Sequence, residues 1–182
     1  MVVFPLGVMI EVLFSALWLM LPAYVANPMA VVFGGGRPID LGRNFPDGRR
    51  LLGDGKTYRG LLGGLLCGVF IGFVQMNTLL SYYLGAHTLS VVCTLSIGAL
   101  MGDLFESFIK RRLGLQRGAE LPLADQLDFV AGAFLLTYLL EPLWFTANFT
   151  PVKLLIVLVT TPILHRITNI IGYQMKLKKE PW

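Results

Sequence analysis

The chain has 182 residues, of which 55% are hydrophobic and only 14% are charged, and its mean hydropathy is +0.68. This composition excludes an ordinary soluble globular domain and is typical of an integral membrane protein. The net charge of +4 and the two cysteines add little, since Cys67 and Cys93 both lie within apolar segments. We therefore expect a single all-α membrane domain over residues 1–182.

Five segments are long and apolar enough to form membrane helices, which need roughly 20 apolar residues each. They are Val2–Ala26, Leu61–Leu84, Leu89–Phe108, Leu123–Phe145 and Val152–Tyr173. Short connections alternate with two charged loops, 27–60 and 109–122, which places both charged loops on one side. Of the fifteen Lys and Arg residues, only Lys153 falls on the opposite side. The positive-inside rule then predicts cytoplasmic charged loops, a cytoplasmic C-terminus and an N-terminus outside.

The first charged loop, 27–60, is rich in Gly and Pro, so we expect little regular structure. A loop of this length is more often functional than merely connecting. Its Gly55-Lys56-Thr57 resembles the end of a phosphate-binding P-loop, but the motif's first Gly is replaced by Arg50 and no strand precedes it. Lys56 and Arg59 could still hold a phosphate beside glycine N–H groups. Equally, they could be snorkelling residues that anchor the following helix.

Carboxylates concentrate at the end of one apolar segment and at the start of the next. Asp103, Glu106 and Lys110 are spaced so that they share one helical face. Asp125 and Asp128 share a face of the following helix. Because the connection between the two helices is short, we expect them to be antiparallel neighbours. The two carboxylate faces would then meet at the cytoplasmic rim of the membrane.

Several carboxylates in one small volume repel each other and need cations. A divalent ion with oxygen ligands is the natural one, and Mg²⁺ is favoured if phosphates complete its coordination. Lys110, Arg111 and Arg117 supply cations for phosphate oxygens, so the cluster is typical of a polyphosphate site. The alternative is that the acids form simple salt bridges with neighbouring basic residues at the membrane rim, which contribute little to stability.

The segment Gly102-Asp103…Glu106-Ser107…Lys110-Arg111, followed by Asp125…Asp128, resembles the signature of CDP-diacylglycerol synthases. The first loop, with Gly34-Gly35-Gly36 and Gly55-Lys56-Thr57, is similar to the archaeal branch of that family, the CDP-archaeol synthases. The resemblance covers nearly the whole chain and includes the five spans. It implies Mg²⁺-dependent transfer of CMP from CTP to the phosphate of an unsaturated archaeal lipid, digeranylgeranylglyceryl phosphate, with pyrophosphate as leaving group.

The resemblance places the family's acidic metal positions on Asp103, Asp125 and Asp128 and its Lys-Arg pair on Lys110 and Arg111, and we assign the other roles from the chemistry of the residues. Mg²⁺ would be held by Asp103, Asp125 and Asp128, with Glu106 as an additional ligand. Triphosphate would be bound by Lys110, Arg111 and Arg117. Lys56, Thr57 and Arg59 would cap the nucleotide or hold the lipid phosphate. The sequence departs from the bacterial signature at Gln126, which stands in place of an Arg, and lacks the Gly-His-Gly-Gly that precedes the last acids.

Three alternatives stay open on sequence alone. A CTP:phosphatidate cytidylyltransferase that acts on ester lipids would carry the same cluster. A small transporter would need ionisable residues deep in the membrane, where only Glu11 and Glu141 lie. A non-enzymatic scaffold that binds anionic headgroups would need basic loops but no carboxylate cluster. The expected partners are CTP, a lipid phosphate and the bilayer, not a nucleic acid; a homodimer is left open.

Overall fold

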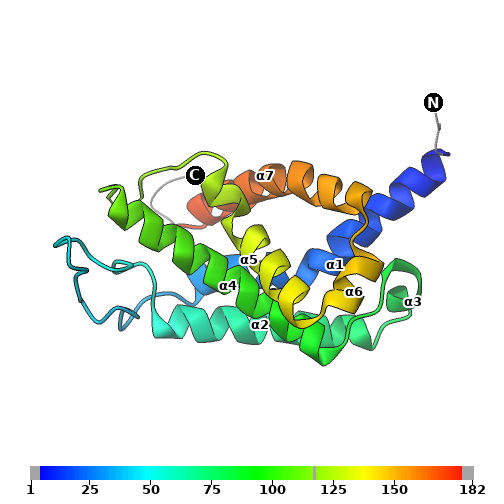
Figure 1. The fold of residues 1–182 in the computed structure, drawn as a ribbon, viewed down its shortest axis with the longest axis horizontal. Helices are drawn as coiled ribbons and strands as arrows, with labels where there is room; N and C mark the ends of the chain where they lie inside the picture. The colour runs from blue at the N-terminus through cyan, green and yellow to red at the C-terminus, as the bar shows by residue number, and fades with distance from the viewer. Residues whose placement is uncertain (1–4, 117, 178–182) are drawn as a thin grey trace.

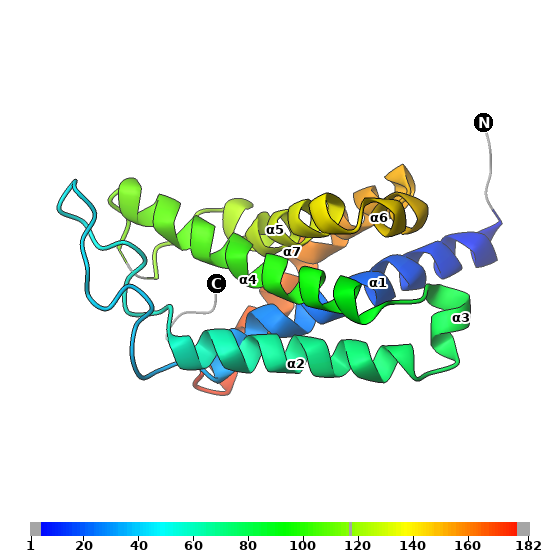
Figure 2. The same cartoon turned by 60° about the horizontal axis from the view of Figure 1, so that its bottom comes forward.

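The structure is a computed structural model that describes residues 5–116 and 118–177. Within these ranges the chain forms helices and no named strand, which confirms the all-α prediction. The helices are α1 (Leu6–Val32), α2 (Tyr58–Met76), α3 (Leu80–Leu84), α4 (Leu89–Arg112), α5 (Ala124–Leu140), α6 (Pro142–Asn148) and α7 (Pro151–Gln174). Figures 1 and 2 show an elongated bundle, with the α1–α2 loop at one end and the short helices α3 and α6 at the other.

Among the described residues, four helices are long and apolar enough to cross a membrane, namely α1, α2, α4 and α7. Many of their large apolar side chains are exposed, for example Leu66 at 59% and Phe70 at 68% on α2. Such surfaces are stable in contact with lipid and unfavourable in water. The chain is therefore a multi-pass membrane protein. The remaining predicted crossing falls on α5, which has only 17 residues.

Two of the expected apolar segments are divided in the structure. The second, 61–84, forms α2 and the separate short helix α3, because the side chains of Asn77 and Thr78 donate hydrogen bonds to carbonyls in the last turn of α2. The fourth, 123–145, divides between α5 and α6 at Pro142, which has no backbone N–H to continue α5. The length of an apolar segment in the sequence does not reveal either of these two breaks.

The approach of α4 to α5 is set by glycine. A Cβ added to Gly102 of α4 would overlap the backbone oxygen of Asp128 on α5, and one added to Gly132 would overlap the backbone of α4. The two backbones therefore touch, as small residues allow in membrane helix pairs. The predicted antiparallel pairing of these helices is confirmed. The contact also fixes the distance between the carboxylates of Asp103 and Asp128, which lie next to it.

The α1–α2 loop, residues 33–57, is ordered around the buried carboxylate of Asp40, whose side chain is 0% exposed. Arg50 Nη2 lies 2.7 Å from Asp40 Oδ1, and the backbone N–H groups of Leu52 and Gly53 donate to Oδ2 at 3.0 and 2.8 Å. Burial favours the neutral form, but these hydrogen bonds outweigh it and hold the pKa of Asp40 well below its usual range. The turn that leads to Lys56 is thus fixed by one ionised side chain.

A second contact docks this loop onto the end of α4. The guanidinium of Arg112 donates to Asp47 Oδ1 at 2.7 Å and lies 4.6 Å from the Phe45 ring centroid and 4.9 Å from that of Phe108. Because a guanidinium can stack on a ring and donate hydrogen bonds at the same time, Arg112 fixes both Asp47 and Phe45 of the loop to the end of α4.

Asp40→Asn should loosen the loop, because the amide cannot replace the ionised acceptor of Arg50 and the backbone N–H groups. We expect tryptic cleavage within residues 33–57 to accelerate by about tenfold or more, as loss of a buried charge-assisted network implies. Asp54→Asn is the matched control, since Asp54 also pairs with Arg50 but its side chain is 65% exposed. Equal cleavage rates in both variants would contradict the anchoring role of Asp40.

The stability that the Asp40 hydrogen bonds give to the loop depends on pH. Asp40 has a lower pKa in the folded chain than the value of about 3.9 expected when unfolded. Its contribution to stability is therefore complete above that unfolded value and is lost as the pH falls through the folded one. Loop protection against an acid-active protease should decline below about pH 4 in the wild type and change little in Asp40→Asn.

Candidate active site

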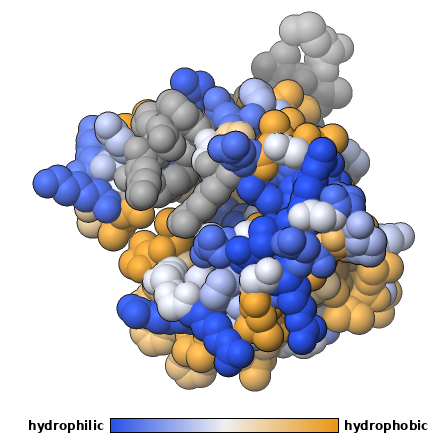
Figure 3. Space-filling view, turned by 90° about the vertical axis from the view of Figure 1, so that its left-hand side faces the viewer, coloured by the Kyte–Doolittle hydropathy of each residue, from blue (hydrophilic) through white to orange (hydrophobic). Residues whose placement is uncertain are grey.

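A cavity of about 1220 Å³ opens at the loop end of the bundle. Its walls come from the α1–α2 loop and from α1, α2, α4, α5 and α7. Viewed from this end, hydrophilic residues gather over the face and hydrophobic residues surround them (Figure 3). Deeper in the bundle the lining becomes apolar, with Leu17 and Leu21 of α1 and Leu164 of α7. The cavity thus joins a polar mouth to an apolar groove.

Most of the residues predicted from sequence line this cavity. They are Lys56, Thr57, Asp103, Glu106, Lys110, Arg111, Asp125 and Asp128. Arg59 does not line it and is exposed on the first turn of α2. Arg117 lies outside the described residues. Thr57 is 3% exposed and caps α2, since its Oγ1 accepts the N–H of Gly60 at 3.1 Å, so its hydroxyl already has a structural role.

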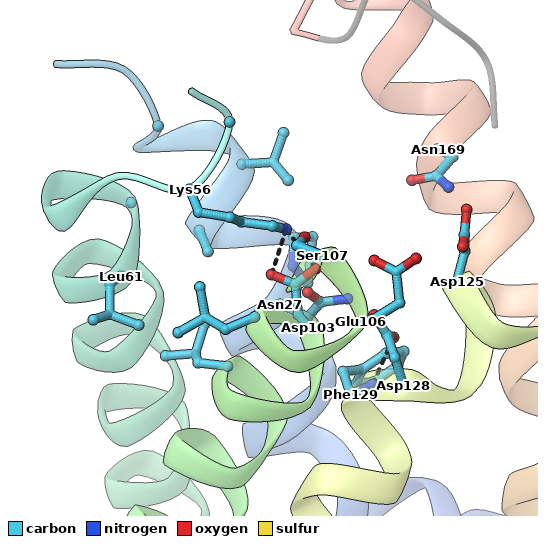
Figure 4. Close-up of a pocket in the computed structure, with 18 of the residues that line it drawn as sticks. Asn27, Lys56, Leu61, Asp103, Glu106, Ser107, Asp125, Asp128, Phe129 and Asn169 are labelled. Atoms are coloured by element: carbon cyan, nitrogen blue, oxygen red, sulfur yellow. Dashed lines mark hydrogen bonds and ion pairs between the residues drawn. The ribbon is translucent and has the colours of Figure 1, made fainter. Parts of the chain in front are cut away.

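Lys56 connects the loop to the carboxylate cluster. Its Nζ lies 2.6 Å from each carboxylate oxygen of Asp103 on α4 (Figure 4). The two side chains are 23% and 20% exposed, so the pair is more strongly coupled than one on the open surface. The sequence interpretation placed Lys56 near phosphate and Asp103 near metal. The structure brings them together as partners.

Lys110 bridges the two helices. Its Nζ lies 2.8 Å from Glu106 Oε1 on α4 and 2.7 Å from Asp125 Oδ2 on α5. Lys110 and Arg111 were expected in the loop 109–122, but α4 continues to Arg112 and places both in its last turns. Basic residues there interact favourably with the unpaired carbonyls at the helix C-terminus, which explains the extension.

Two carboxyl groups have oxygen atoms without a partner among the described residues. Asp125 Oδ1 is buried and accepts no hydrogen bond from the described residues. Asp128 makes no ion pair with them, and its Oδ1 accepts only the N–H of Phe129, at 2.6 Å. Figure 4 shows Glu106, Asp125 and Asp128 around the same space. Buried carboxyl oxygens in this state are stabilised by a bound cation or by a proton, which makes the cavity suited to a charged ligand.

The chemistry of the four acids Asp103, Glu106, Asp125 and Asp128 fits Mg²⁺, because their carboxylates offer the hard oxygen ligands that this ion prefers. The structure does not present these acids as a formed metal centre. Within residues 5–116 and 118–177, no group of three or more His, Cys, Asp or Glu is arranged to hold a metal ion. Lys56 instead pairs with Asp103, and Lys110 is shared between Glu106 and Asp125.

The cavity also contains polar residues that the sequence interpretation missed. Tyr24 and Asn27 come from α1, and Thr161, His165 and Asn169 come from α7. The Tyr24 hydroxyl and Thr161 Oγ1 are 2.8 Å apart and join the two helices. The sequence did carry a signal for three of them, because Thr161, His165 and Asn169 recur every four residues and so share one face of a largely apolar helix.

Fold and site together define a class: a helical, multi-pass membrane protein whose polar end holds a cavity of carboxylates, lysines and one arginine that opens toward an apolar groove. A family model described as CarS-like, CDP-archaeol synthase, matches residues 9–182. The chain belongs to the CDP-archaeol synthase family. This confirms the resemblance that its motifs indicated.

Individual relatives support the same family assignment. A CDP-archaeol synthase of Methanosarcina mazei is 55% identical over 175 residues, covering 90% of this chain and 100% of the relative. One of Methanoregula boonei is 55% identical over 165 residues with the same coverage. A solved structure, reported as an intramembrane enzyme for archaeal membrane lipid biosynthesis, has a TM-score of 0.73 and 42% identity. That match covers 85% of this chain and 92% of the solved one.

Proposed function

We propose that this chain transfers CMP from CTP to the phosphate of an unsaturated isoprenoid glycerol ether, and that the transfer depends on Mg²⁺. Family membership supports the cytidylyltransferase activity and the archaeal lipid substrate. The observation that carries the proposal is the shape of the cavity, whose charged mouth is continuous with an apolar groove between α1 and α7. A nucleotide from water and a phosphate on a lipid could meet there without the lipid leaving the membrane.

The reaction exchanges one bond to phosphorus for another. An oxygen of the lipid phosphate bonds to the α-phosphorus of CTP, and the bond from that phosphorus to the β-bridging oxygen breaks, with its electron pair leaving on pyrophosphate. A phosphate monoester has its second pKa near 6 and is largely deprotonated at neutral pH, so no protein base is needed. The main barrier is repulsion between two anions. Lys56 and Lys110 lie where they can reduce it and align the reacting groups.

Asp103, Asp125 and Asp128 would hold Mg²⁺, with Glu106 as an additional ligand. When bound, the ion would neutralise phosphate charge and stabilise the leaving pyrophosphate. The unpartnered oxygen of Asp125 and the unpaired carboxylate of Asp128 support this assignment. Lys56 and Lys110, which pair with three of the four acids, are of a length and charge that also suit phosphate oxygens.

We place the cavity mouth, the α1–α2 loop and the C-terminus in the cytoplasm, and the N-terminus outside. The distribution of Lys and Arg supports this orientation. It requires five crossings, with α5 as the fourth. The antiparallel contact of α5 with α4 supports that role, and its 17 residues are near the lower limit for a membrane helix.

Purified protein in lipid nanodiscs, given CTP, Mg²⁺ and digeranylgeranylglyceryl phosphate, should form a CDP-lipid and release pyrophosphate in equal amounts. EDTA should stop product formation and excess Mg²⁺ should restore it. Phosphatidic acid replaces the ether lipid in a parallel reaction, and we expect slower turnover. Faster turnover on phosphatidic acid would assign the chain to ester lipids instead. If neither lipid gave product, the proposed activity would be overturned. Full activity in EDTA would overturn the role of Mg²⁺.

A further inference from the structure

A second, smaller cleft lies beyond the main cavity, at the end of α4. Its volume is about 280 Å³. Its lining includes Arg49, Arg50, Gly53, Asp54 and Arg111. Three of these residues are arginines, so we call it the arginine cleft. Gly53, Asp54 and Arg111 line the main cavity as well, so the two spaces share a wall.

The arginines of this cleft differ in how they are neutralised. Arg50 lies between two carboxylates, 2.7 Å from Asp40 Oδ1 and 2.8 Å from Asp54 Oδ1. Arg49 donates through Nη1 to the backbone oxygen of Arg112, which is neutral. Arg111 makes no ion pair with the described residues, and its Nε is buried without a hydrogen-bond partner.

A half-buried guanidinium with no counter-charge is unfavourable unless a ligand supplies one. Because the guanidinium donors form a planar fork, a phosphate group is the anion that they match best. Arg111, at the junction of the two spaces, can contact an anion that extends from the main cavity into the cleft.

The position of the cleft along α4 specifies which phosphate it would take. From Asp103 to Arg111 the helix advances by eight residues, or about 12 Å, toward the polar end of the molecule. The apolar lining at Leu17 and Leu21 lies in the opposite direction, deeper in the bundle. In-line displacement needs the attacking and leaving oxygens on opposite sides of the phosphorus. A lipid phosphate that comes from the apolar side therefore directs the leaving group toward the arginines.

We propose that the arginine cleft binds the β- and γ-phosphates of CTP and then the released pyrophosphate, with Arg111 and Arg49 as the contacting residues. The inference rests on the proposed function, in which pyrophosphate is the leaving group. It assigns a binding role to Arg49 and gives the nucleotide a direction in the site. Arg50, bound to Asp40, serves as the fixed wall of the cleft.

The test compares two inhibitors of the reaction, pyrophosphate and CMP, in Arg111→Gln, Arg49→Gln and the wild type. CMP lacks the β- and γ-phosphates and should not reach the cleft. We expect the inhibition constant of pyrophosphate to rise by about tenfold or more in both variants, as loss of a charge-assisted contact implies. The inhibition constant of CMP should stay within about twofold of the wild-type value. Arg43→Gln is the matched control, because Arg43 is exposed on the same loop and lines neither space.

Three outcomes would overturn the inference. Unchanged pyrophosphate inhibition in both folded variants would remove the cleft from the site. A parallel rise for CMP and pyrophosphate would indicate general damage. The third outcome is unchanged pyrophosphate inhibition combined with a lost dependence on anionic lipid, measured in nanodiscs with and without phosphatidylglycerol. It would assign the cleft to a lipid headgroup.

If the wild type made no CDP-lipid, the proposed function would fail by itself. Calorimetric titration of pyrophosphate into the wild type and Arg49→Gln would then test the cleft separately. Should Arg111→Gln fail to fold, judged by its thermal transition, Arg49→Gln carries the same comparison.

Discussion

Asp128→Asn is expected to lower the rate of CMP transfer by about a hundredfold to a thousandfold, the range seen when one electrostatic contact is removed from an active site. Asp128 is the cavity acid that makes no ion pair with the described residues, so its carboxyl oxygens are available to a cationic ligand. The amide keeps the shape of the side chain and removes the charge. The measurement is the initial rate of CDP-lipid formation at saturating CTP in nanodiscs.

The matched control is Glu120→Gln, which makes the same chemical change at an exposed position between α4 and α5 that does not line the cavity. Its rate should stay within about twofold of the wild type. Both variants should insert into the membrane and elute from size exclusion like the wild type. Near-normal turnover of a folded Asp128→Asn protein would exclude Asp128 from the reaction.

Gly102→Ala should have the second largest effect, although the change adds a single methyl group. The new Cβ would overlap the backbone oxygen of Asp128, so α4 and α5 must separate. Overpacking of this kind costs about 1–3 kcal/mol of stability. A shift of about 1 Å among catalytic groups can cost about a hundredfold in rate. Asp103 follows Gly102 directly, so separation of the helices moves both carboxylate faces. Turnover and the thermal transition are measured together.

Gly7→Ala provides the comparison, because a Cβ at Gly7 of α1 has no neighbour within 4 Å. It should leave both turnover and thermal transition as they are. The α4–α5 contact would lose its role in positioning the carboxylates if Gly102→Ala retained full turnover. A fall in stability with unchanged turnover would exclude that positioning role as well.

The parts of the site that follow from helical periodicity could be predicted from sequence. Asp103, Glu106 and Lys110 are spaced to share a face, and the structure places them on one wall of the cavity. Asp125 and Asp128 follow after a short connection, which makes the pairing of α4 with α5 the simplest arrangement. Local spacing carried this information, so no knowledge of distant contacts was needed.

The contacts that depend on the irregular loop could not be predicted. Lys56 meets Asp103 across 47 positions of sequence, and the path between them is set by the hydrogen bonds to Asp40. Nothing in the pattern around Asp40 distinguishes it from an exposed turn residue. The path also uses glycines at positive φ, such as Gly53 at 93°, whose conformation is compatible with many loop shapes.

The most direct test of the central claim is a crystal structure of the wild-type protein with CTP and Mn²⁺, in which anomalous scattering locates the metal. We expect the anomalous peak inside the main cavity, coordinated by oxygens of Asp103, Asp125 and Asp128. The α-phosphate should lie beside the metal, and the β- and γ-phosphates should point toward Arg111. A metal and nucleotide bound outside this cavity, with Lys56 and Lys110 still paired to their carboxylates, would contradict it.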